Sequence, residues 1–164
     1  MKEYEYSFKV KSIKPFIDYC EENGYEKVSE VIQNRIVYEN KHTEDIIARI
    51  TKKIIDGNEK AVFDIKNVGK RNENLKDSTE SIPLTITEEN TNIIDSMLSV
   101  LDFYEAANNY RTRYIYVKNG VKFEIDDYIR PKMQVIGIEG NKDAVDTIYN
   151  EIIQNKIGNI LKDE

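Results

Sequence analysis

Hydrophobic and polar residues alternate along much of the chain, a pattern typical of β-strands with one polar face. The alternation is strict from residue 3 to residue 10, where every second side chain is aromatic or apolar. The pattern and the turn residues predict seven further strands. They run from about 31 to 39, 45 to 55, 60 to 67, 78 to 86, 108 to 117, 121 to 127 and 133 to 139.

Three other segments have helical spacing. Residues 15–23 begin with Pro15 and end at Asn23-Gly24, and residues 142–157 form the last helix. Between them, Thr87 opens a helix that ends near Phe103 and carries one apolar stripe. The stripe comprises Ile93, Ile94, Met97, Leu98 and Leu101.

The order of these elements is one strand, a helix, four strands, a helix, three strands and a helix, which predicts an α+β fold. No repeat or linker rich in Pro, Gly or Ser divides the chain, so we expect residues 1–164 to form a single domain.

Composition narrows the classes of function. The 164 residues include 30 acidic and 24 basic side chains, and the net charge of −6 argues against a nucleic-acid partner. No apolar run approaches the roughly 18 residues of a spanning helix, and acidic residues occupy the N-terminal segment. We therefore expect a cytoplasmic protein with no membrane partner.

The single Cys20 excludes an internal disulfide, and a Ser-His-Asp triad would require the single His42. We therefore expect any chemistry to depend on carboxylates, Lys, Arg and a metal ion.

The period of two places charged side chains on one face of successive strands and apolar side chains on the other. The charged face either meets water or lines the inside of a closed eight-stranded antiparallel β-barrel whose outside is covered by helices. Inside a barrel these groups need each other, water or a charged ligand as partners, and a polyphosphate with Mg²⁺ or Mn²⁺ fits that requirement. The charged set is Glu3, Glu5, Lys9, Arg49, Lys53, Asp64, Lys66, Arg111, Arg113, Lys122, Glu124, Asp126 and Glu139.

Six short motifs follow one another on these strands. The first three are Glu3-Tyr4-Glu5-Tyr6-Ser7-Phe8, Ala48-Arg49-Ile50-Thr51 and Phe63-Asp64-Ile65-Lys66. After the long helix come Arg111-Thr112-Arg113-Tyr114-Ile115-Tyr116, Glu124-Ile125-Asp126 and Gly137-Ile138-Glu139. In type and order they resemble the motifs of the CYTH or triphosphate tunnel superfamily, which includes class IV adenylate cyclases, thiamine triphosphatases and inorganic triphosphatases. The resemblance implies the closed barrel, or tunnel, and a bound triphosphate with a divalent metal.

Three positions depart from the family pattern. Ser7, Thr51 and Gly137 stand where the family has lysine, arginine and glutamate. Lys9 and Lys53 lie one inward-facing step further along their strands, roughly 6.6 Å away, where a long side chain reaches part of the way back. No carboxylate replaces the one missing at Gly137, so we expect weaker metal binding.

The resemblance also implies roles for individual residues. A divalent-metal-dependent hydrolase of tripolyphosphate, ATP or thiamine triphosphate is the first expectation. A class IV adenylate cyclase and a non-catalytic polyphosphate- or nucleotide-binding protein are the alternatives. The implied metal ligands are Glu3, Glu5, Asp126 and Glu139 for Mg²⁺ or Mn²⁺, with Glu3, Glu5 and Arg113 catalytic. The implied phosphate-binding residues are Lys9, Arg49, Lys53, Lys66, Arg111 and Arg113.

Overall fold

The computed structural model describes residues 2–69, 71–72, 74–155 and 157, with side chains from Tyr4 onward except at positions 71 and 72. In chain order the described elements are β1 (Lys2–Val10), α1 (Lys14–Glu22), β2 (Glu26–Asn40), β3 (Ile46–Ile55), β4 (Asn58–Asn67), β5 (Arg71–Asn72), β6 (Leu75–Glu80), β7 (Leu84–Thr85), α2 (Glu88–Val100), β8 (Phe103–Lys118), β9 (Val121–Arg130), β10 (Met133–Gly140) and α3 (Lys142–Gln154).

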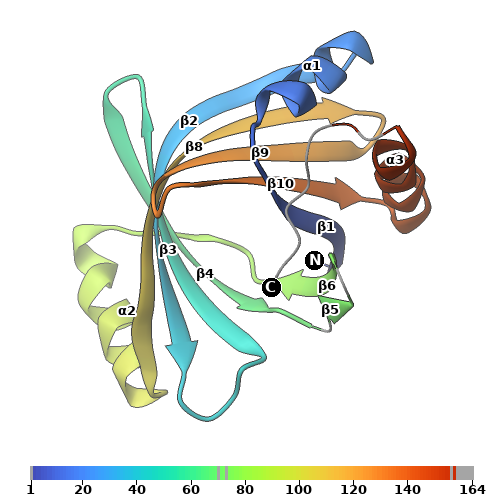
Figure 1. Cartoon of the computed structure of the whole chain (residues 1–164). Helices are drawn as coiled ribbons and strands as arrows, with labels where there is room; N and C mark the ends of the chain where they lie inside the picture. Colours follow the sequence, from blue (N-terminus) through green and yellow to red (C-terminus); the bar gives the residue numbers. More distant parts are fainter. Residues whose placement is uncertain (1, 70, 73, 156, 158–164) are drawn as a thin grey trace.

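The strands form one antiparallel sheet that rings round on itself. Its order is β5-β6-β1-β10-β9-β8-β2-β3-β4-β7, and β4 also pairs with β6. That extra pairing joins Lys66 to Glu80 and Asn67 to Thr79. The eight longer strands thus form a continuous ring of hydrogen-bonded neighbours, and Figure 1 shows the sheet curving round with the helices outside it. The predicted α+β order and the antiparallel pairing are confirmed.

One predicted strand is wrong in its bounds. The segment 78–86 was expected as a single strand, whereas β6 covers Leu75–Glu80 and β7 is a separate pair, Leu84–Thr85. Pro83 lies in the break between them, and a proline has no N–H to donate to a ladder. The remaining strands and helices have the predicted positions with shifted ends, and the largest shifts are the earlier starts of β2 at Glu26 and of β8 at Phe103.

The outer face of the ring is covered unequally. Under α1 and α3 lies a large apolar core to which β1, β9 and β10 contribute, with Phe16, Phe123 and Ile138 fully buried. Under α2 lies a small one, made of Ala48, Phe63, Ile94 and Leu98. Figure 1 shows α2 at the opposite end of the molecule from α3.

The apolar stripe predicted for α2 is only partly buried. Ile94 and Leu98 pack on the sheet, whereas Ile93, Met97 and Leu101 are exposed. Two residues four apart suffice for contact where a single helix lies on a sheet, so the other apolar side chains of the stripe remain in water.

Two tight turns fix the register of the hairpins. Asp56-Gly57 joins β3 to β4 and Asn119-Gly120 joins β8 to β9, and all four residues have positive φ. Two successive residues of positive φ form the type I′ turn, whose twist matches that of the strands. Both hairpins were predicted from these residues. Within the described part of the chain, no helix has the length and apolarity needed to span a bilayer.

Candidate functional site

The inside of the strand ring contains a cavity of about 730 Å³. Because side chains alternate along a strand, the same strands that bury apolar residues outward present charged residues inward. On β9, Phe123 and Ile125 are buried in the outer core while Lys122, Glu124 and Asp126 line the cavity. Of the described residues, eight basic and six acidic side chains line it, a surplus of two positive charges. They are Glu5, Arg35, Arg49, Lys53, Asp64, Lys66, Lys76, Glu80, Arg111, Arg113, Lys122, Glu124, Asp126 and Glu139.

Most of the site residues predicted from the sequence converge on this cavity. Lys9 does not, because it is exposed near the end of β1. Glu3 lies in β1 opposite Ser78, and its side chain falls outside the described residues. Those lining the cavity are Glu5, Arg49, Lys53, Lys66, Arg111, Arg113, Asp126 and Glu139.

Arg113 is held by carboxylates of the neighbouring strand. It lies in β8 directly opposite Asp126, and its Nε and Nη2 donate to the two carboxylate oxygens at 2.7 and 2.9 Å. Glu124 approaches the same guanidinium at 3.1 Å. Burial opposes the charge of Arg113, but the two carboxylates outweigh it and raise its pKa. The side chain is therefore fixed and ionised.

Arg49 on β3 is held in the same way. Its cross-strand partner on β4 is Asp64, which accepts from Nε at 2.9 Å and also from Nη2. Glu80 of β6 accepts from the same Nη2 at 3.0 Å and lies 3.5 Å from Lys66. Glu80 is thereby part of the cavity wall, although it is not in the charged set sorted from the sequence.

Arg111 has neutral hydrogen-bonding partners. Gln33 Oε1 accepts from Nε at 3.1 Å and from Nη2 at 2.9 Å, while the Tyr128 hydroxyl lies 2.5 Å from Nη1. Both partners lie directly opposite Arg111, one on each neighbouring strand. The nearest carboxylate oxygen, on Asp126, is 3.8 Å away.

Lys122 joins the carboxylates of two strands. Its Nζ lies 2.6 Å from Glu139 and 3.1 Å from Glu124. Burial opposes the charge on Lys122, yet the two glutamates raise its pKa. For Glu124, burial alone would raise the pKa, but Arg113 and Lys122 outweigh it and hold the pKa below its usual value.

Sequence reasoning missed Arg35. It lies in β2 and lines the cavity together with Gln33 and Val37, which alternate with it. Its Nε donates to Thr51 Oγ1 at 3.0 Å. The period of two along residues 33–37, which places Arg35 on the same face as Gln33 and Val37, is the signal that identifies it.

The glycine at position 137 makes room for a carboxylate. Gly137 lies in β10 opposite Ser7 on one side and Glu124 on the other. A Cβ atom at this position would lie 2.7 Å from Glu5 Oε1. The Glu5 side chain therefore occupies the space that a larger residue at 137 would need.

The described carboxylates do not form a ligand set for a metal ion. Among the described residues, no group of three Asp, Glu, His or Cys side chains is arranged to hold one. Asp126 instead binds Arg113, and Glu139 binds Lys122. The assignment of Mg²⁺ or Mn²⁺ to Glu3, Glu5, Asp126 and Glu139 stays a prediction.

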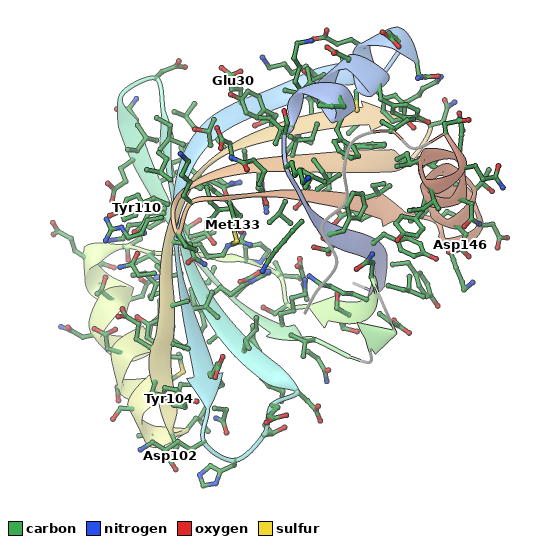
Figure 2. All side chains as sticks on the ribbon, viewed as in Figure 1. Glu30, Asp102, Tyr104, Tyr110, Met133 and Asp146 are labelled. Carbon is green, nitrogen blue, oxygen red and sulfur yellow. The ribbon has the colours of Figure 1, made fainter. Side chains whose placement is uncertain are left out.

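The only histidine takes no part in this cavity. His42 Nε2 lies 2.6 Å from Asp102, and both side chains are exposed. Figure 2 labels Asp102 at the end of the molecule where β8 begins. A Ser-His-Asp triad is therefore not part of the site.

Solved structures share this fold. The PH1012 protein from Pyrococcus horikoshii OT3 has a TM-score of 0.75 and 17% sequence identity, over 99% of this chain and 96% of that one. The PH1819 protein from the same organism has a TM-score of 0.71 and 20% identity, over 99% and 94%. HpAC1 from Hippeastrum, a candidate adenylyl cyclase described as having a dominant triphosphatase activity, has a TM-score of 0.65 and 14% identity, over 94% and 87%.

No protein-family model and no curated protein matches the chain. The structural likeness extends over nearly the whole chain, so the protein shares the fold of these structures, among them HpAC1.

Proposed function

We propose that the cavity binds the triphosphate group of an inorganic or organic triphosphate, with the closed strand ring acting as a tunnel around it. The observation that carries the proposal is the convergence of four arginines on one cavity, in a chain whose net charge is −6. A guanidinium presents its N–H donors in a planar fork that matches phosphate oxygens, so several arginines around one space favour a polyanion. The four are Arg35, Arg49, Arg111 and Arg113.

Orientation before binding supports the same ligand class. Arg113 uses Nε and Nη2 for Asp126, and a guanidinium carries five N–H donors, so further donors remain for a phosphate oxygen. Its carboxylate partner fixes the plane of the group in advance, which lowers the entropy lost on binding. Arg49, held by Asp64, has the same arrangement.

Hydrolysis of the bound triphosphate is a second candidate function. Acidic residues line the same cavity as the cations, and the Hippeastrum protein of this fold is described as a triphosphatase. In such a reaction the cations would neutralise charge on the transferred phosphoryl group while water attacks in line. If a ribose hydroxyl attacked instead, ATP would give cyclic AMP and pyrophosphate.

A binding and turnover screen tests both functions. Thermal unfolding is followed with tripolyphosphate, ATP, thiamine triphosphate and orthophosphate, each with Mg²⁺, with Mn²⁺ and with a chelator. A ligand at about 100 times its Kd stabilises the folded state by about 2.7 kcal/mol, so a triphosphate should raise the Tm clearly while orthophosphate at equal concentration should not. A Tm unaffected by every triphosphate would overturn the proposal.

The same samples are then assayed for phosphate release, and the products are separated by chromatography. Lys66→Gln removes a cavity cation, and Lys132→Gln is the exposed control. Hydrolysis predicts phosphate release that Lys66→Gln lowers and Lys132→Gln leaves unchanged. Stabilisation without any product would leave binding as the whole function.

A further inference from the structure

The cations of the cavity differ in what lies directly opposite them in the sheet. Arg113 faces Asp126, Arg49 faces Asp64, Lys122 faces Glu139 and Lys66 faces Glu80. In each case the facing residue is a carboxylate on the adjacent strand, and the two form an ion pair. Cross-strand register therefore determines which cations the protein neutralises by itself.

Three cavity cations have no carboxylate directly opposite them. One is Arg111, which faces Gln33 and Tyr128 but lies 3.8 Å from Asp126. The other two are Arg35 and Lys53. Arg35 lies between Thr51 on β3 and Asn109 on β8, and Lys53 lies between Gln33 on β2 and Lys60 on β4. Neither cation forms an ion pair with any described residue. The facing side chains are neutral or basic, so the register supplies no negative charge here.

The two side chains are close enough to act on one group. Arg35 faces Thr51, and Lys53 is two residues further along β3 on the same face. Diagonal neighbours of this kind are about 7–8 Å apart, within reach of two long side chains. Arg113 is the chief neighbouring charge that repels each of them, after the burial that already opposes their ionisation.

These surroundings lower the pKa of both groups. For Arg35 burial is the main cause, followed by Arg113, Arg111 and Arg49, and for Lys53 burial is again followed by Arg113. Arginine keeps its proton in proteins, so for Arg35 the lowered pKa expresses an unfavourable electrostatic environment for the cation. Glu124 offsets part of this cost for both cations, but its ion pairs are with Arg113 and Lys122, so a bound anion would relieve the remainder.

We propose that Arg35 and Lys53 form an anion subsite on the β2–β3 wall, which binds one phosphoryl group of a polyphosphate through charge-assisted hydrogen bonds from both side chains. This inference rests on the proposed triphosphate function and adds to it the position of one phosphoryl group. Thr51 Oγ1 accepts from Arg35 Nε and so leaves the terminal nitrogens of the guanidinium directed elsewhere, available to the ligand.

Isothermal titration calorimetry with inorganic tripolyphosphate tests the subsite on the full chain. Arg35→Gln and Lys53→Gln should each weaken binding about tenfold or more, since a hydrogen bond to a charged group contributes about 1.5–3 kcal/mol. Arg35→Lys should retain part of the affinity because it keeps the charge. Lys52→Gln is the matched control, since Lys52 is next to Lys53 in β3 and does not line the cavity.

The outcomes separate the two proposals. If the wild-type chain binds tripolyphosphate and Arg35→Gln binds it within twofold, the subsite is wrong and the proposed function stands. If the wild-type chain binds no tripolyphosphate, both proposals fail. The Tm of each variant without ligand is measured alongside, and Arg35→Gln should melt no lower than the wild type because it removes a cation without an ion-pair partner.

Discussion

The cavity has two walls that carry similar numbers of cations but differ in electrostatics. On the β8–β9 wall, Arg113 lies among Asp126 and Glu124, and the network continues through Lys122 to Glu139. On the β2–β3 wall, Arg35 and Lys53 face neutral or basic residues, and of the described cations there only Arg49 has a carboxylate opposite it, Asp64 of β4. The comparison separates two uses of a buried cation. A paired cation stabilises its carboxylate partners, whereas an unpaired one costs stability, and under the proposed subsite a bound anion would offset that cost.

The largest expected effect comes from breaking the paired wall. Arg113→Met leaves Asp126 and Glu124 buried without their guanidinium, and we expect it to lower the free energy of unfolding by about 3–5 kcal/mol. Urea denaturation at pH 7 measures the loss. Arg130→Met is the control, since Arg130 is exposed at the end of the neighbouring strand β9 and its guanidinium lies over the Tyr110 ring, so the substitution should lower the free energy of unfolding by only about 0.5–1 kcal/mol. A loss below about 1 kcal/mol for Arg113→Met would contradict the comparison.

Acid should weaken the same wall through Glu124. Its pKa in the folded chain is held below the usual 4.5, so its ionised form stabilises the fold above that pH and the contribution is lost as the pH falls further. Glu124→Gln should therefore lower the free energy of unfolding by about 2 kcal/mol at pH 7. The difference in this free energy between the variant and the wild type should become smaller below about pH 4. Urea titrations from pH 7 to pH 3 measure it. A gap that stays constant over that range would show that Glu124 does not couple to Arg113 and Lys122.

A smaller effect is expected from the one hydrogen bond that orients Arg35. Thr51→Val keeps the shape of the side chain and removes the oxygen that accepts from Arg35 Nε at 3.0 Å. The expected loss is about 1 kcal/mol, because a buried donor then lacks its acceptor. Thr112→Val is the comparison on β8, because the Thr112 hydroxyl accepts no hydrogen bond from a described arginine. Equal losses in the free energy of unfolding for both variants would remove any special role for Thr51.

Removing the charge of Arg35 should change the free energy of unfolding least, and in the opposite direction. Arg35→Met replaces a cation without an ion-pair partner by an apolar side chain of similar length, so the free energy of unfolding without ligand should stay level or rise by about 1 kcal/mol. Chemical denaturation without phosphate measures it. A loss above about 2 kcal/mol would mean that Arg35 is as structural as Arg113, and the distinction between the walls would fail.

The sequence predicted which charged residues share a face better than it predicted which of them form ion pairs. The period of two placed Asp64, Glu124 and Asp126 on the same face as Arg49 and Arg113, and the structure confirms that they line one cavity. Which carboxylate meets which base depends on cross-strand register, and register follows from turns and bulges that the alternation does not report.

Arg35 and the exposed apolar residues of α2 differ in what the sequence could show. The pairing of β2 with β8 shifts register between Lys27 and Ser29 and between Val37 and Tyr38, but residues 33–37 lie between the shifts and alternate regularly, so the sequence contained the signal for Arg35. The apolar stripe of α2 was predicted correctly as a helical pattern, but nothing in the pattern states how wide a surface the sheet offers it. Ile94 therefore became buried and Ile93 did not.

The seam between β4 and β6 has a consequence for local opening. Only two residue pairs join these strands, whereas β3 and β4 share ten. Amide hydrogens at residues 66–67 and 79–80 should therefore exchange with solvent sooner than those in the rest of the ring. Lys66 and Glu80 lie at this seam and line the cavity. A polyanion bound there would therefore slow amide hydrogen exchange in the β4–β6 pairing, which has only two residue pairs.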